Sequence, residues 1–248
     1  MKGAGALAAA AALGLCVSLA SALGAEIGPL APPGTPAVAF PKPSRPVAEI
    51  ISPIWATEKE RDGVDEFGQV SRALGLAPGM AVADIGAGSG YYAVRLARLL
   101  GPAGRVLAQD VTPRYLADLA ARVRREKLGN VMVVRGEPHD ARLPAGSVDV
   151  ALLVHMYHEI DQPFGLLHNL VPALRPGGRV GIVDLDRPTS QHGTPRALLA
   201  CELTAVGFRQ VDIRELSGDV GYLAVFEPPA SDARLPPAAV KPCPVSGR

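Results

Sequence analysis

Three glycines at every second position, Gly86, Gly88 and Gly90, follow a short apolar run, and an amphipathic segment at residues 93–100 comes next. Glycine has no Cβ, so a strand-to-helix turn of this kind lets a ligand lie against bare backbone. Asp84 lies within the apolar run, where a carboxylate is costly unless a polar or cationic group meets it. The segment therefore predicts a strand–turn–helix unit with a binding site at the turn.

The spacing of these glycines also limits the ligand. A dinucleotide site needs G-x-G-x-x-G, with a pyrophosphate at the helix start. Here the pattern is G-x-G-x-G and the acid Asp84 precedes it, which suits a cationic ligand without phosphate. Asp110 ends the next apolar run, about twenty residues further on, where a ribose-binding acid is expected. Because NAD sites use the same kind of acid, Asp110 alone does not choose between the cofactors.

Apolar runs alternate with helical patterns along the rest of the chain. After the first strand, the expected strands are 105–110, 131–134, 148–154, 179–185 and a hairpin-like pair around residues 211 and 222. Such alternation predicts one α/β domain with a largely parallel sheet, and the final pair predicts an antiparallel edge.

Residues 84–90 resemble the acidic-x-G-x-G-x-G motif of class I S-adenosylmethionine (SAM)-dependent methyltransferases. Residues 174–179, Leu-Arg-Pro-Gly-Gly-Arg, resemble the turn before that family's fifth strand, and the resemblance extends over about residues 50–227. It implies a Rossmann-like three-layer sandwich whose seven-stranded sheet is mostly parallel with an antiparallel last strand. It also implies SAM as the cofactor, and an acidic pocket suits the sulfonium and ammonium groups of SAM.

The resemblance assigns the glycine turn to the cofactor. The backbone at Gly86, Ala87, Gly88 and Gly90 would border the ligand. Asp84 would orient this loop and water near the amino group of SAM, although amides of its own loop could equally satisfy its carboxylate.

Two later acids complete the expected cofactor site. Asp110, with Val111 beside it, would bind the ribose hydroxyls. The polar loop after the strand at 131–134 resembles the adenine-binding segment, where Asp140 could accept a hydrogen bond from the adenine amino group. Glu137 and His139 are the alternatives in the same loop.

The catalytic candidates follow the strand at 148–154, because ligands of such folds lie beyond the carboxyl ends of parallel strands. His158 is the first candidate for a general base, since its ordinary pKa lies near neutrality, and Glu159 is the second. Tyr157 would shape the wall that faces the methyl group. His158 could instead cap the next helix or bind a backbone carbonyl, and His155 is expected to be structural. No Cys/His cluster has metal-ligand spacing, so no metal site is predicted.

Residues 57–60 form a capping box that predicts a helix before the first strand. Arg61-Asp62 near its start resembles a pair found in a subgroup of exported bacterial methyltransferases. The pair could be a solvated charge pair on a helix face. Alternatively, Trp55 and Arg61 would form a lid over the cofactor or substrate.

The chain ends differ from the domain in composition. Residues 1–25 resemble a signal peptide with an Ala-x-Ala site, which predicts a periplasmic or secreted protein; an inner-membrane anchor is the alternative. Residues 26–49 are Pro-rich and predict an extended linker, and residues 228–248 predict a disordered tail. Cys201 and Cys243 could pair in an oxidising compartment, but the expected disorder of the tail argues against that disulfide.

The formal net charge is +1 and no basic run is present, so nucleic acid is excluded as a substrate. The short segment 185–198 leaves room for only a small cap, which favours a small-molecule acceptor of unspecified type. The leading prediction is therefore a SAM-dependent methyltransferase. A non-catalytic SAM-binding or sensor protein is the alternative, and an NAD-dependent oxidoreductase is disfavoured by the glycine spacing. Membrane attachment is expected only through the N-terminal segment, and nothing in the sequence indicates the oligomeric state.

Overall fold

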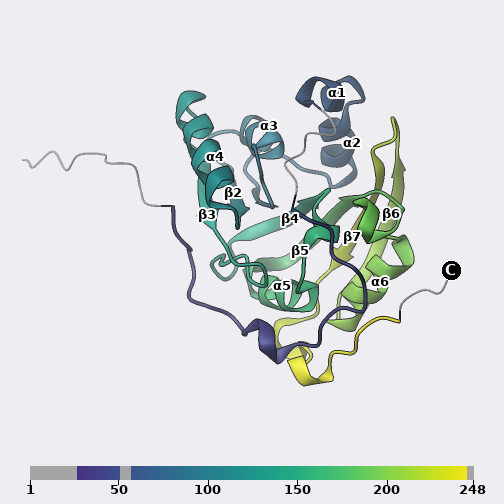
Figure 1. Ribbon diagram of the computed structural model, residues 1–248. Coiled ribbons are helices and arrows are strands. Elements are labelled where there is room, and N and C mark those ends of the chain that lie inside the picture. Colours follow the sequence, from purple (N-terminus) through teal and green to yellow (C-terminus); the bar gives the residue numbers. More distant parts are fainter. Residues whose placement is uncertain (1–26, 51–56, 245–248) are drawn as a thin grey trace, which may run out of the picture.

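The structure is a computed structural model that describes residues 27–50 and 57–244 (Figure 1). Its centre is a seven-stranded sheet with strand order β3-β2-β1-β4-β5-β7-β6. β7 pairs antiparallel with β5 and with β6, and the remaining neighbours are parallel. The predicted Rossmann-like sandwich, with a mostly parallel sheet and an antiparallel last strand, is confirmed.

The strands are β1 Ala81–Ile85, β2 Arg105–Asp110, β3 Val131–Arg135, β4 Val148–Val154, β5 Leu174–Asp184, β6 Arg209–Leu216 and β7 Gly221–Glu227. The α-helices are α1 Glu58–Gly63, α2 Glu66–Ala73, α3 Tyr91–Leu100, α4 Pro113–Arg125, α5 Pro163–Leu170 and α6 Arg196–Ala205. Short 3₁₀ turns are η1 Ala37–Ala39, η2 Tyr157–Glu159, η3 Val171–Ala173, η4 Thr189–Gln191, η5 Ser231–Ala233 and η6 Pro237–Ala239.

Successive residues of the central strands enter opposite cores, as the pleat of a strand requires. Val82 and Val106 pack with the apolar faces of α2, α3 and α4 on one side of the sheet. Ala83 and Leu107 pack with α5 and α6 on the other side. Both faces are thus covered, with the two groups of helices on opposite sides of the sheet in Figure 1.

The N-terminal segment 27–50, for which an extended linker was predicted, packs against the domain and contains the turn η1. Phe40 is buried in the core next to α5, with its ring 5.1 Å from the ring of His168. Arg45 is also buried and forms an ion pair of 2.9 Å with Glu202 of α6. We refer to residues 27–50 as the N-terminal strap.

The prediction of a disordered tail is wrong for residues 228–244. Val240 joins the core on the α5 side, and Cys243 forms a disulfide with Cys201 of α6. Proline-rich composition indicated disorder because proline cannot join a sheet ladder. Here the tail is held instead by apolar burial and by a covalent bond to a residue 42 positions earlier, so the expectation against this disulfide was also wrong.

The capping box at Thr57 and Glu60 is confirmed, but two helices follow it rather than one. The helix is interrupted at Asp65, whose backbone is left-handed with φ of 53°. Within residues 27–50 and 57–244, no helix has the length and apolar character needed to cross a membrane. The predicted signal peptide or anchor lies outside the described residues.

Candidate functional site

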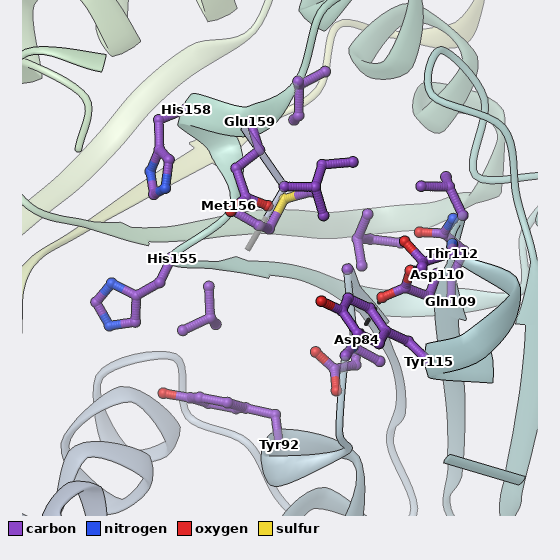
Figure 2. A pocket seen from close by; sticks show the side chains of 18 of the residues that line it. Asp84, Tyr92, Gln109, Asp110, Thr112, Tyr115, His155, Met156, His158 and Glu159 are labelled. Atoms are coloured by element: carbon purple, nitrogen blue, oxygen red, sulfur yellow. Dashed lines mark hydrogen bonds between the residues drawn. The ribbon is translucent and has the colours of Figure 1, made fainter. Parts of the chain in front are cut away.

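A cavity of about 350 Å³ lies beyond the carboxyl ends of β1, β2 and β4. Figure 2 shows Asp84 and Asp110 at the ends of β1 and β2, with His158 and Glu159 beyond the end of β4. The glycine turn contributes Gly86, Ala87, Gly88 and Ser89 to the lining. This is the position at which open α/β sheets bind ligands.

The three glycines are required for different reasons. All have positive φ, between 51° and 86°. A Cβ at Gly86 would lie 2.9 Å from Cγ of Met156, and one at Gly90 would lie 2.5 Å from Cδ1 of Leu119. Gly88 is buried, yet a Cβ there would meet no protein atom within 4 Å. Gly88 therefore leaves space for a ligand, whereas Gly86 and Gly90 allow the turn to pack; Gly90 does not line the cavity.

Asp110 is anchored on the same turn. Its Oδ2 accepts a hydrogen bond of 2.9 Å from the amide of Gly88, and its Oδ1 accepts one of 2.8 Å from the amide of Thr112. Each carboxylate oxygen can accept a second hydrogen bond. Asp110 and Val111 both line the cavity, so a diol could bind at this carboxylate.

Asp84 lines the cavity at the end of β1 and is almost fully buried. Burial, with a smaller contribution from the charge of Asp110, raises the pKa of Asp84 to about 7; Arg61 and the amide of Ala93 oppose that rise. Its Oδ2 has no hydrogen-bond partner within the described part of the chain. A buried oxygen without a partner is costly, so this site favours a ligand that brings a cation or a donor.

Arg61 also reaches this cavity, from α1. Its guanidinium binds Glu66 through two nitrogens, at 2.9 and 2.5 Å, and lies 3.8 Å above the ring of Tyr91. Asp62 points instead to α3, where it accepts a hydrogen bond of 3.0 Å from the Tyr91 hydroxyl. Because Arg61 is buried, the solvated-pair interpretation is wrong for it, and Trp55 lies outside the described residues.

The adenine prediction fails at Asp140. Its Oδ2 accepts from the amide of Gly34 in the N-terminal strap and its Oδ1 from the amide of Arg142, both at 2.8 Å, and it does not line the cavity. Glu137 does line the cavity, together with Pro138. The turn between residues 137 and 140 directs one acid to the cavity and the other to the strap.

His158 lies on turn η2 at the other side of the cavity. Its Nδ1 is 3.0 Å from both carboxylate oxygens of Asp184, at the end of β5. Asp184 is completely buried and also accepts hydrogen bonds from the hydroxyl of Thr194 at 2.6 Å and the amide of Leu185 at 2.9 Å. With a carboxylate at Nδ1, the neutral ring carries its proton there, so Nε2 keeps a lone pair.

Two residues next to His158 differ in position. Glu159 lines the cavity. Tyr157 does not; it is fully buried, with Arg45 5.5 Å from its ring centre. Burial, and then the charge of Glu202, raises the pKa of Tyr157 well above its usual range. The side chain of Tyr157 therefore packs into the core, and its assignment to the cavity wall was wrong.

His155 and His192 also line the cavity. Burial lowers the pKa of His155 to about 4, and its Nε2 lies 3.7 Å from Glu66, in agreement with a structural role. One ligand-type atom from each of His158, Glu159 and His192 lies within 4.8 Å of the others. Linear spacing gave no sign of this group, because His192 follows a different strand.

Residues 82–178 match the family described as "Methyltransferase domain". The arsenite methyltransferase of Halobacterium salinarum is 27% identical over 163 residues, which are 64% of this chain and 41% of that protein. The demethylmenaquinone methyltransferase of Lactococcus lactis is 23% identical over 150 residues, 58% of this chain and 60% of that protein. The chain spans about half the length of the curated relatives it matches.

Among solved structures, a SAM dependent methyltransferase from Aquifex aeolicus is similar, with a TM-score of 0.62 and 25% identity. The match covers 67% of this chain and 91% of that one. The [4+2]-cyclase SpnF is also similar, with a TM-score of 0.55 at 22% identity, covering 71% of this chain and 67% of that one. That second match shows the fold alone, since one fold can serve several chemistries.

Proposed function

We propose that this chain, whose residues 82–178 form a methyltransferase domain of the class I SAM-dependent kind, transfers the methyl group of SAM to a small-molecule acceptor. The observation that carries the proposal is a single cavity with two acids and a glycine turn on one side and a carboxylate-bound histidine on the other. The first set of residues suits the cofactor, and the second suits the acceptor.

The residues fit SAM in charge and in shape. The carboxylate of Asp110 would bind the ribose hydroxyls, and Gly88 leaves room for the ligand against the backbone. The unpartnered Oδ2 of Asp84 would meet the ammonium group of SAM. Glu137, rather than Asp140, is the acid that lines the cavity and would accept from the adenine amino group, although its Oε1 already accepts from Arg142. Gly86, Ala87 and Val111 would complete this half of the cavity.

Bound SAM would supply a methyl group on a sulfonium: the acceptor forms a bond to the methyl carbon while the sulfur–methyl bond breaks and its electron pair stays on sulfur. The protein contributes mainly proximity, by holding the acceptor against the methyl group. An acceptor that begins protonated must also lose its proton. The lone pair on Nε2 of His158 can take it, and Asp184 would stabilise the imidazolium that forms. Glu159 is the second candidate for this role.

The small-molecule acceptor is supported by the size of the cavity, which lies near the lower end of the range for small-molecule sites. The relatives named above act on arsenite and on demethylmenaquinone, which are also small molecules. These two acceptors have little in common chemically, so relatives do not select one for this chain.

Export to the periplasm or outside the cell is part of the same proposal. The Ala-rich segment 1–25 supports it, and so does the disulfide between Cys201 and Cys243, because disulfides persist in oxidising compartments. Cell fractionation and N-terminal sequencing of the mature chain test it. A full-length chain in the cytoplasm would refute export, and a full-length chain in the inner membrane would support the anchored form.

Calorimetric titration with SAM tests the cofactor site. Gly88→Val should abolish or greatly weaken binding because its side chain fills ligand space. Gly146→Val is the matched control: Gly146 has φ of 58° against 51° at Gly88, and its Cβ also meets no atom within 4 Å, but it lies on an exposed turn outside the cavity. Equal SAM affinity in the Gly88 and Gly146 variants would refute the assignment.

Asp110→Ala should also weaken SAM binding, because it removes the acceptor for the ribose hydroxyls. Incubation of purified protein with labelled SAM and a metabolite extract then tests turnover. Transfer of label to a small molecule would support the enzyme. SAM binding without transfer over a broad range of acceptors would favour the sensor alternative, and binding of NAD in place of SAM would overturn both.

A further inference from the structure

The group formed by His158, Glu159 and His192 contains two imidazoles and one carboxylate on the wall of the cavity. The first two belong to turn η2 after β4, and His192 ends turn η4 after β5. Two imidazoles with one carboxylate are a common ligand set for divalent transition metals and leave further coordination positions open. We propose that these three side chains bind a divalent transition-metal ion at the acceptor side of the cavity.

The partner of His158 is the first argument. Histidines that bind metals almost always donate their other ring N–H to a carboxylate, carbonyl or water, which fixes the tautomer and the orientation of the ring. Asp184 provides such a carboxylate at 3.0 Å from Nδ1, and it is held in turn by Thr194 and Leu185. Nε2 of His158 is then the nitrogen that presents a lone pair.

The conformation of His192 is the second argument. Its backbone is left-handed, with φ of 57°, which is unfavourable for a residue with a side chain. Its amide donates to the carbonyl of Thr189 at 3.1 Å, and its own carbonyl accepts from Arg187 at 3.1 Å, so the turn is held despite the strain. Nδ1 of His192 is buried without a hydrogen-bond partner among the described residues, and a metal ion would satisfy it.

Distances set the movement that binding requires. Two ligands of one ion, each about 2.1 Å from it, lie at most about 4.2 Å apart. The three atoms here lie within 4.8 Å of one another, and ligands of a tetrahedral ion lie about 3.4 Å apart, so the widest pair must close by up to roughly 1.4 Å. His192 is only partly buried, which leaves its side chain room for this shift.

If the chain transfers methyl groups as proposed, the metal would also define the acceptor class. An ion with three protein ligands can hold an oxygen or sulfur atom of the acceptor in an open position. A phenol, enol or thiol would lose its proton to water when it binds the ion, and the resulting anion would attack the methyl group. In that state Nε2 of His158 is a ligand and does not act as a base.

Metal binding tests the site without any need for turnover. Untagged full chain, stripped with a chelating resin, is titrated with Co²⁺ by visible absorption and then with Zn²⁺ in competition. One equivalent should bind, and His192→Ala and Glu159→Gln should each weaken binding at least about tenfold. His139→Ala is the control, because His139 does not line the cavity, and it should bind as the wild type does.

SAM titration of the same samples separates the two proposals. Metal binding that is absent in the wild type, or unchanged in both ligand variants, overturns the metal site whatever SAM does. Metal binding with the expected losses, in a protein that does not bind SAM, supports the metal site and overturns the methyltransferase assignment. Circular dichroism of each variant identifies any that fails to fold, and Glu159→Gln then replaces His192→Ala as the deciding variant.

Discussion

Arg45 offers the sharpest test of how the acceptor side of the cavity is built. Its side chain is 3% exposed and that of its partner Glu202 is 1% exposed. The same guanidinium donates to the carbonyls of Tyr157 at 3.3 Å and Ile160 at 3.2 Å, which flank His158 on turn η2. Arg45→Met would leave a buried carboxylate and three buried carbonyls, those of Tyr157, His158 and Ile160, without this donor.

Removal of one member of a buried ion pair costs about 3–5 kcal/mol, because the remaining charge stays desolvated. For a domain of this size, 1 kcal/mol lowers Tm by about 2–4 °C, so Arg45→Met should lower Tm by roughly 6–20 °C. Arg72→Met is the matched control. Arg72 is 2.7 Å from Asp65, but these side chains are 67% and 61% exposed, so its loss should cost about 0–1 kcal/mol.

The double variant Arg45→Met/Glu202→Met provides the second arm. It removes the carboxylate of Glu202 together with Arg45, so no unpaired charge stays buried, and it should be clearly more stable than Arg45→Met alone. Urea denaturation measures the wild type, the single variants Arg45→Met, Glu202→Met and Arg72→Met, and the double variant. SAM affinity should change little because Arg45 does not line the cavity. The reasoning is refuted if Arg45→Met costs no more than Arg72→Met, or if the double variant costs the sum of its single changes.

Three further predictions concern other parts of the molecule. The pKa of Asp84 is raised from 3.8 to about 7, so its neutral form is favoured in the ligand-free protein below that pH. SAM should therefore bind more tightly as pH rises through 7 and release a proton, as calorimetry in buffers of different ionisation enthalpy would measure. The free energy of unfolding of the ligand-free protein should also fall as the pH rises from 3.8 to about 7, because the unfolded chain loses this proton before the folded one does. Asp84→Asn should remove that fall. Opening the Cys201–Cys243 disulfide, which closes a 42-residue separation, should cost about 4 kcal/mol by chain entropy, measured by denaturation with and without reductant. Phe40→Ala should cost about 3–5 kcal/mol in the same assay if the N-terminal strap is part of the core.

Each of these has a clear contrary result. Proton uptake, or SAM affinity that is independent of pH between 6 and 8, would show that Asp84 does not ionise on binding. Two free thiols in the unreduced chain, at Cys201 and Cys243, would contradict the disulfide. A loss below about 1 kcal/mol for Phe40→Ala would mean that the strap contributes little to the core.

The proximity of the glycine turn to Asp110 could be predicted from the sequence because the contacts between them are local. The glycine turn joins β1 to α3 directly, and Asp110 ends the next strand in order. Once the two strands pair, Asp84 and Ala108 share a register position, so Asp110 lies near the turn by geometry alone. The alternation of apolar runs with helical patterns likewise predicted a largely parallel sheet covered by helices, because few other arrangements bury both kinds of element.

The acceptor half could not be predicted, because its contacts join residues far apart in the chain. His158 is recognisable, but Asp184 is 26 residues away and Arg45 is 113 residues before His158. The prediction for Asp140 was wrong for the same reason. The local pattern identified a loop that does line the cavity, but the carboxylate of Asp140 accepts from the amide of Gly34, 106 residues earlier. Glu202 of α6 is buried beside Arg45, which lies 157 residues earlier in the chain, and no local sequence pattern indicates that pair.

These contacts attach both terminal segments to the elements around His158, on the side of the cavity where we propose that the acceptor binds. Arg45 connects the N-terminal strap to η2 and to Glu202, and the adjacent Cys201 connects α6 to the C-terminal tail. The amide of Ala48 also donates to the carbonyl of His158 at 3.1 Å. A chain without the N-terminal strap and the C-terminal tail would keep the residues at the ends of β1 and β2 that we assign to SAM. It would lose the contacts of Arg45 and Ala48 that hold the turn with His158. We therefore infer that oxidation and an intact strap matter for the acceptor side first, because the cofactor side is held by backbone hydrogen bonds within the sheet and its turns.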